Sequence, residues 1–195
     1  MQIFLSASVP KVGRGNFYEN SDPFLIQVAI RELVTSVIRR HTLVWGGHPS
    51  ITPMIWAICK DLGIQYAERV RLYQSRLFQD DFPDENEKFE NVIYVDQVGN
   101  NLSASLAGMR YQMIGRNHFD AGIFVGGMEG ILEEHSLFAE HQPTAKRIIL
   151  TAAGGAAQQL GDSLLESDDV ISSTVDFAEL FDRIFPQSPP NPHAA

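Results

Sequence analysis

The sequence predicts an α/β fold: a single doubly wound parallel sheet flanked by helices, formed by residues 1–185. Three observations lead to this prediction. Short apolar runs alternate with segments whose apolar residues recur at helical spacing, which is the pattern of strands joined by crossover helices. Two apolar runs end in a glycine pair, Gly46-Gly47 and Gly126-Gly127, where a buried strand can turn sharply. No internal repeat divides the 195 residues, and their 44% hydrophobic content is enough for one full core.

The first half of the chain opens with an apolar strand over residues 2–8, followed by a loop that contains Gly and Asn. Ser21-Asp22-Pro23 is a good helix start, because a capping side chain precedes a proline at a position where no N–H is needed. Four apolar residues then recur at helical spacing: Leu25, Ala29, Leu33 and Val37. A strand at 42–45 leads into the first Gly-Gly loop, and Pro53 opens a helix that ends near Gly63.

The second half continues the same alternation. Residues 79–91 are rich in Asp and Glu, and we expect them to form a solvated loop. Further strands are expected at 70–73, 92–95, 121–125, 147–151 and 170–172, and further helices at 101–117, 131–140, from Gly155 to about 165, and 177–184. The segment 186–195 contains four prolines and no apolar period, so it is predicted to be disordered.

Composition excludes several classes of protein. The net charge of −9 argues against a broad nucleic-acid surface, which needs clustered Lys and Arg. No apolar run reaches the roughly 18 residues that span a bilayer. The single cysteine, Cys59, cannot form an internal disulfide, and the N-terminal residues lack a signal-peptide pattern, so we expect a cytoplasmic protein. The histidines have no metal-ligand spacing, and neither a metal nor a cofactor is expected.

The two double-glycine loops are the strongest functional signal. Glycines at the carboxyl end of a strand let the backbone approach a ligand closely, and the first N–H groups of a following helix favour an anion. Two such loops in one domain indicate a phosphate-bearing small molecule at the carboxyl edge of the sheet. The alternative is that both pairs only permit tight turns.

The residues around the second loop resemble a known family. Arg110, Met113, the strand at 123–125, Gly126-Gly127 and Glu133 are similar to the signature of LOG-type nucleotide phosphoribohydrolases. These belong to the SLOG (Smf/DprA–LOG) superfamily of Rossmann-like nucleotide binders, in which an arginine on a helix precedes a strand and a Pro-Gly-Gly-x-Gly-Thr-x-x-Glu loop follows it. The resemblance covers residues 2 to 155. It implies a Rossmann-like nucleotide-binding domain.

Three departures from the family pattern bear on activity. Val125 stands in place of the motif proline, Met128-Glu129-Gly130 in place of x-Gly-Thr, and His48-Pro49 in place of a glycine-richer stretch. SLOG domains also occur as ligand sensors, including in bacterial antiphage defence, where a nucleotide-derived signal need not be cleaved. The resemblance therefore leaves two functions open. One is hydrolysis of the N-glycosidic bond of a nucleoside monophosphate or related nucleotide. The other is non-catalytic sensing of an ADP-ribose-like or cyclic signal.

Arg110 and Glu133 are the candidate catalytic residues. Hydrolysis of an N-glycosidic bond develops positive charge on the ribose, and a carboxylate such as that of Glu133 stabilises this charge or orients water. Arg110 could neutralise phosphate or position the carboxylate, because its planar guanidinium pairs in bidentate fashion. Glu129, within the second loop, is the alternative carboxylate. In the simpler interpretation, Glu133 and Glu134 form the exposed side of an amphipathic helix.

The candidate ligand-binding residues lie where three strands end. They are Ser6, Ser8, Gly46, Gly47, His48, Gly126, Gly127, Met128, Glu129 and Gly130. The resemblance also implies a homodimer or a higher homo-oligomer that forms through helices beside the site. Within the helix at 101–117, one face carries Leu102, Leu106, Met109 and Met113, which indicates either a core face or an interface.

Overall fold

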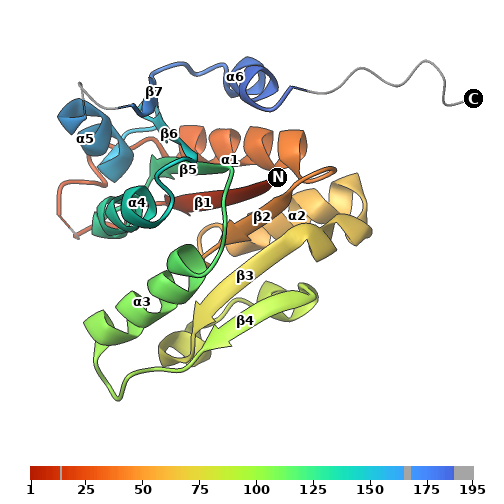
Figure 1. The fold of residues 1–195 in the computed structure, drawn as a ribbon, viewed down its shortest axis with the longest axis vertical. Helices are drawn as coiled ribbons and strands as arrows, with labels where there is room; N and C mark the ends of the chain where they lie inside the picture. Colours follow the sequence, from red (N-terminus) through yellow and green to blue (C-terminus); the bar gives the residue numbers. More distant parts are fainter. Residues whose placement is uncertain (14, 165–167, 187–195) are drawn as a thin grey trace, which may run out of the picture.

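The computed structural model describes residues 1–13, 15–164 and 168–186. Within these residues, seven parallel strands form one sheet with helices on both faces (Figure 1), which confirms the predicted fold class. The strands are β1 (Gln2–Ser8), β2 (Thr42–Trp45), β3 (Val70–Ser75), β4 (Asn91–Val95), β5 (Ala121–Gly126), β6 (Lys146–Leu150) and β7 (Val170–Ser172). The helices are α1 (Pro23–Val37), α2 (Thr52–Leu62), α3 (Leu102–Arg110), α4 (Glu129–His141), α5 (Gly155–Ser163) and α6 (Phe177–Ile184).

The strand order places a topological switch point at the middle of the sheet. The order is β4-β3-β2-β1-β5-β6-β7, so β1 pairs with β2 on one side and with β5 on the other. The chain winds outward in opposite directions from β1 and β5, and a crevice opens between the two connections. Ligands of open parallel sheets bind at such a crevice, outside the carboxyl ends of the strands.

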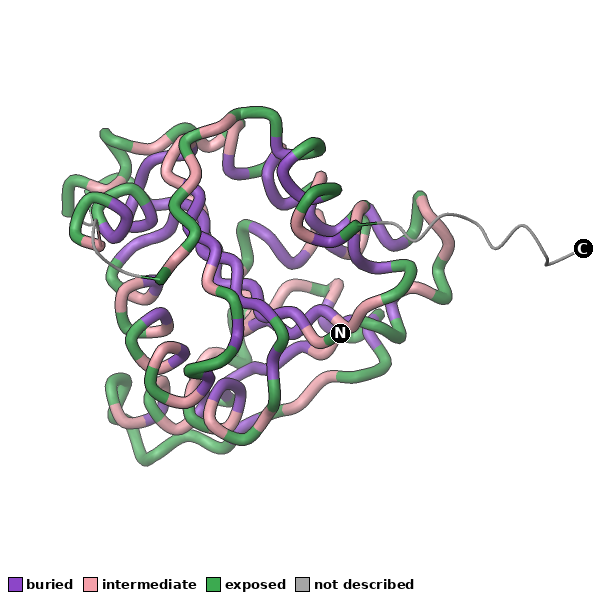
Figure 2. Tube along the Cα trace, turned by 45° about the horizontal axis from the view of Figure 1, so that its top comes forward, coloured by how far each residue is buried: buried purple, intermediate pink, exposed green. Residues whose placement is uncertain are grey.

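The core has two layers, one on each face of the sheet. Helices α1, α2 and α6 pack together on one face, and α4 packs with α5 on the other, where α3 also lies (Figure 1). On the second face Phe4 of β1 stacks on Phe138 of α4, with ring centroids 5.4 Å apart. The buried residues gather along the strands and the inward sides of the helices (Figure 2). This packing fixes the rotation of each helix relative to the sheet.

Local sequence signals account for the helix boundaries. The Asp22 carboxylate accepts hydrogen bonds from the first backbone N–H groups of α1, and Pro23 is the first helical residue. Gly63 ends α2 with a φ of 140°, a conformation that other residues rarely adopt. Both boundaries agree with the prediction.

Three segments differ from the sequence-based expectation. The expected solvated loop at 79–91 instead holds short 3₁₀ turns, and within it Asn86 and Phe89 are buried because the Phe89 ring packs edge-on against Trp56. The helix expected over 101–117 is α-helical to Arg110 and continues as a π-helical turn over Tyr111–Gly115. Helix α4 begins at Glu129, so this residue lies in the first helical turn rather than in the loop.

Two further expectations concern the ends of segments. Helix α5 ends at Ser163, and the predicted helix end near 165 lies outside the described residues. The predicted disorder of 186–195 falls outside them too, apart from Pro186. None of the helices in the described ranges is long and apolar enough to cross a bilayer.

Candidate functional site

A cleft of about 570 Å³ opens at the carboxyl edge of the sheet, at the switch point. The ends of β1, β2 and β3 form its floor, and the first turn of α4 and the side of α3 form one wall. Residues Phe78, Phe82 and Pro83, which follow β3, form the opposite side. The cleft therefore brings together segments that are far apart in the sequence.

A hydrogen-bonded carboxylate lies on the wall of this cleft. The Ser6 hydroxyl of β1 donates to Oε2 of Glu134 at 2.5 Å, and Nε of Arg110 donates to Oε1 of the same carboxylate at 3.3 Å. A second nitrogen of Arg110, Nη1, pairs with Glu133. The side chains of Arg110 and Glu134 are 13% and 16% exposed, whereas that of Glu133 is 62% exposed. Arg110 thus joins a cleft carboxylate to a surface one.

The environment of Glu134 acts on its pKa in opposing ways. Burial raises the pKa of this carboxyl, because desolvation disfavours the charged form. The positive charge of Arg110 and the hydrogen bonds from Ser6 and Arg110 oppose this effect. A carboxylate that is both desolvated and paired with a fixed cation is a frequent feature of functional sites.

Most of the predicted site residues line the cleft. Those that do are Ser6, Ser8, Gly46, Gly47, His48, Arg110, Met128, Glu129 and Gly130. The predicted residues outside the lining are Gly126, Gly127 and Glu133.

The second glycine pair has a bonding role within the fold. Gly126 and Gly127 have φ values of 60° and 72°. The Gly127 N–H donates to the carbonyl of Ser8 at 2.8 Å, and its own carbonyl accepts from Ala156 at 3.0 Å. These glycines therefore join the ends of β1 and β5 to the start of α5.

His48 lies on the first glycine loop, at the rim of the cleft. Its Nδ1 is 2.7 Å from the Ser50 hydroxyl, and its backbone N–H donates to the Thr52 hydroxyl at 3.3 Å. These contacts hold the loop against the start of α2. The described residues contain no group of three or more His, Cys, Asp or Glu side chains that could hold a metal ion.

Several lining residues escaped the sequence-based prediction of the site. The most important is Glu134, the residue that follows the predicted Glu133 on α4. One step along the helix turns its side chain to a different face, and this face lines the cleft. The others include Lys11, Gln74 and Asp81. Glu134 lies on the same face of α4 as Gly130, because residues four apart lie on one face of a helix, but only the structure shows that this face lines the cleft. No signal in the sequence marks Gln74.

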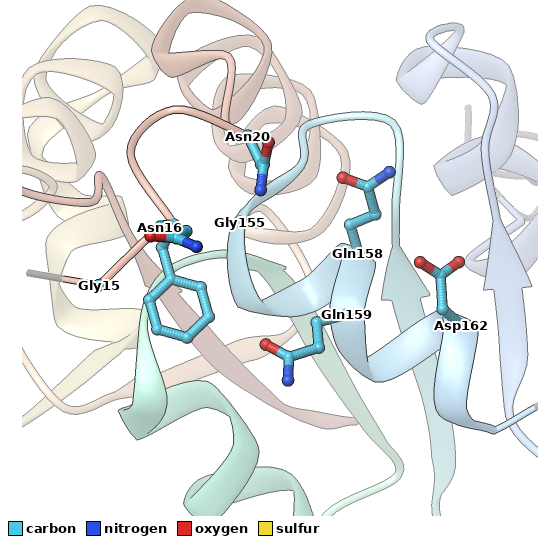
Figure 3. Close-up of a pocket in the computed structure, with 8 residues that line it drawn as sticks. Gly15, Asn16, Asn20, Gly155, Gln158, Gln159 and Asp162 are labelled. Carbon is cyan, nitrogen blue, oxygen red and sulfur yellow. The ribbon is translucent and has the colours of Figure 1, made fainter.

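A second concavity, of about 600 Å³, lies beside the start of α5 (Figure 3). Its polar side chains are those of Asn16, Asn20, Gln158, Gln159 and Asp162, and Figure 3 shows them spread around Gly155 rather than converging on one point. Its described lining includes no Lys or Arg. The switch-point cleft, which has the charged network, is therefore the better candidate site.

Comparisons with known proteins agree with this assignment of the fold. A family model described as the SLOG cluster3 family matches residues 16–185, so the chain belongs to this family, which confirms the resemblance found in the sequence. No curated protein matches the chain. The X-ray structure of TM1055, a Northeast Structural Genomics Consortium target, is similar with a TM-score of 0.58 and 14% identity, over 94% of this chain and 98% of that one. At that identity, the likeness concerns the fold alone.

Proposed function

We propose that this SLOG-family protein binds a nucleotide in the switch-point cleft and hydrolyses its N-glycosidic bond. The observation that carries the proposal is the carboxylate of Glu134, which Ser6 and Arg110 hold on the cleft wall. Water is the only co-reactant that this hydrolysis needs.

The network suits the charge that develops in the reaction. As the bond between ribose and base breaks, positive charge accumulates on the sugar ring, and a nearby carboxylate stabilises it. Because Ser6 and Arg110 already fix the orientation of Glu134, little reorganisation accompanies the reaction. Glu134 takes the role that the sequence suggested for Glu133, whose side chain is exposed and lies outside the cleft lining.

Two features support a phosphate on the ligand. Lys11 and Arg110 are the cations that line the cleft in the described part of the chain. Helix α4 starts at the cleft without a side-chain hydrogen bond at its N-cap residue, Met128. Its first N–H groups are therefore candidates to bind an anion.

A non-catalytic sensor is the second candidate function. Glu129 places a carboxylate in the first turn of α4, and this charge repels a dianionic phosphate at the helix start. A ligand with less charge per phosphate, such as an ADP-ribose-like or cyclic species, fits that arrangement better. In this case the protein would transmit binding through assembly or a partner, as in antiphage defence.

Base release separates these functions. We expect the wild-type protein to be stabilised by nucleoside monophosphates and to release base from at least one of AMP, GMP, CMP and UMP. Glu134→Gln should lower the rate by about a hundredfold or more, because it removes the charge and keeps the shape. Glu133→Gln is the matched control and should change the rate by only a few-fold. Tight binding without base release in the wild type would favour the sensor, and loss of activity in Glu133→Gln alone would reassign the carboxylate.

We also propose that the protein forms a homodimer through α3. Leu102 is 50% exposed on this helix, and Leu106, four residues on and on the same face, is half-buried. Met109 and Met113, from the face predicted in the sequence, are buried in the core. Light scattering should give twice the mass of the chain, and Leu102→Glu should shift the protein towards monomer. A monomeric wild type at all concentrations would contradict the proposal.

A further inference from the structure

We infer that Gln74 is a specificity-determining residue, whose side-chain amide binds the polar edge of a nucleobase. This inference rests on the proposed nucleotide binding and adds to it the place and the means of base recognition. The base edge that fits is one with a hydrogen-bond donor and an acceptor side by side, because a glutamine amide offers one of each in the same plane.

The first observation is a cleft-lining amide that pairs with no described residue. Gln74 lies near the end of β3, is only 5% exposed and lines the cleft. Its side chain makes no hydrogen bond to any residue that the structure describes. The amide atoms are not among the fully buried polar atoms that lack a partner in the described residues, so they keep access to the cleft. The amide is therefore free to pair with a ligand bound in the cleft.

The second observation is the space that Gly47 leaves for the amide. Gly47 has a φ of 60°, and a Cβ atom at this position would overlap Nε2 and Cδ of Gln74. The amide therefore rests against the bare backbone of the first glycine loop, which also lines the cleft. Because Gly47 has no side chain, the amide has room to lie in this position. This role of Gly47 is separate from any contact that the loop makes with phosphate.

The third observation is the distance across the sheet. Pairing aligns Leu5 of β1 with Trp45 of β2, and Trp45 with Leu72 of β3. The backbones of Ser6 and Gln74 therefore lie near the same level, on strands that are two positions apart, which is about 10 Å. Their side chains leave opposite faces of the sheet, since Ser6 shares a face with Phe4 and Gln74 shares one with Leu72. A ligand that reaches both crosses the carboxyl edge of the sheet, with its sugar at the Ser6–Glu134 network and its base extending toward β3.

An aromatic wall completes the base end of the cleft. Phe78 and Phe82 line the cleft just after β3, and the Phe82 ring stacks on Tyr94 with centroids 5.7 Å apart. Aromatic rings provide stacking surfaces for any base, whereas hydrogen bonds to the base edge distinguish one base from another. The polar contact that provides this selection is the amide of Gln74.

Gln74→Met tests the inference, because methionine has a similar length and no amide. We would measure dissociation constants by calorimetry for AMP, GMP, CMP, UMP and ribose 5-phosphate, which has the sugar and phosphate but no base. The best-bound nucleotide should lose about tenfold or more in affinity, whereas ribose 5-phosphate should change less than twofold. Gln79→Met is the control, since Gln79 is exposed and lies outside the cleft lining. Gln74→Leu, which also lacks the amide and adds no charge, replaces the first variant if that variant does not fold.

The outcomes separate this inference from the proposed function. Unchanged nucleotide affinity in Gln74→Met would overturn the role of Gln74 and leave nucleotide binding intact. An equal loss for ribose 5-phosphate would also overturn it, because the residue would then shape the whole cleft. If the wild type binds none of these compounds, the proposed function fails and the base-reading role fails with it.

Discussion

Replacing Gly47 with alanine tests the contact between the first glycine loop and Gln74. The positive φ of 60° costs a residue with a Cβ about 1–2 kcal/mol. The added Cβ would also overlap the Gln74 amide and lie 2.9 Å from Cδ1 of Leu72. Displacing these side chains adds about 1 kcal/mol, the lower end of the overpacking range, because the amide is the end of a flexible chain. We expect Gly47→Ala to lower the free energy of unfolding by about 2–3 kcal/mol.

Gly99 provides the matched control for the backbone contribution. Its φ is 52°, but a Cβ at this position would meet no atom within 4 Å. Gly99→Ala should therefore cost only the backbone contribution, about 1–2 kcal/mol. Urea unfolding followed by circular dichroism gives the change in unfolding free energy for both variants. The comparison requires that the slope of this free energy against urea concentration stays the same in each variant.

A double-mutant cycle isolates the contact with the amide. Gln74→Ala removes the closest atoms that the new Cβ would overlap and leaves the contact with Leu72, so Gly47→Ala should cost up to about 1 kcal/mol less in that background. Gly47→Ala should also weaken binding of the best nucleotide as Gln74→Met does, because the displaced amide no longer faces the cleft. A coupling energy near zero, with unchanged nucleotide affinity, would refute the reasoning that the glycine seats Gln74.

Three further predictions concern stability. Burial raises the pKa of Glu134 in the folded state, so the folded protein binds this proton more tightly than the unfolded chain and loses stability as the pH rises above the ordinary value of 4.5. Glu134→Gln should therefore gain melting temperature relative to the wild type as the pH rises above 4.5, and a constant difference would contradict this. Gly154→Ala should cost about 3 kcal/mol or more in urea unfolding, because its Cβ would overlap the backbone carbonyl of Asn20, which cannot rotate away; a cost below that of Gly99→Ala would contradict the overlap. Asp22→Ala should cost about 1 kcal/mol, because two N–H groups of α1 lose their acceptor; Asp22→Asn, which keeps the acceptor, should cost little.

The fold was largely predictable from the sequence, because its signals are local. Backbone conformation and hydrogen bonding mark the boundaries of elements at particular residues. These residues are Asp22 followed by Pro23, Gly63, and the glycine pairs at the ends of β2 and β5. The segments that were predicted less accurately depend on contacts with residues distant in the sequence. Phe89 makes part of an acidic stretch fold against Trp56, which lies on α2 and is remote in the sequence.

The sequence by itself determined the alternation of strands and helices, the family resemblance and the strand ends at which the cleft forms. Only the tertiary structure decided which glutamate faces the cleft, because burial of Ile131 and Phe138 sets the rotation of α4 and turns Glu134 toward Ser6. It also decided that Gln74 lies beside Gly47, since that contact depends on the pairing of β2 with β3. Hydrophobic periodicity specifies which face of an element is buried, whereas the neighbours of a polar side chain depend on how distant elements pack.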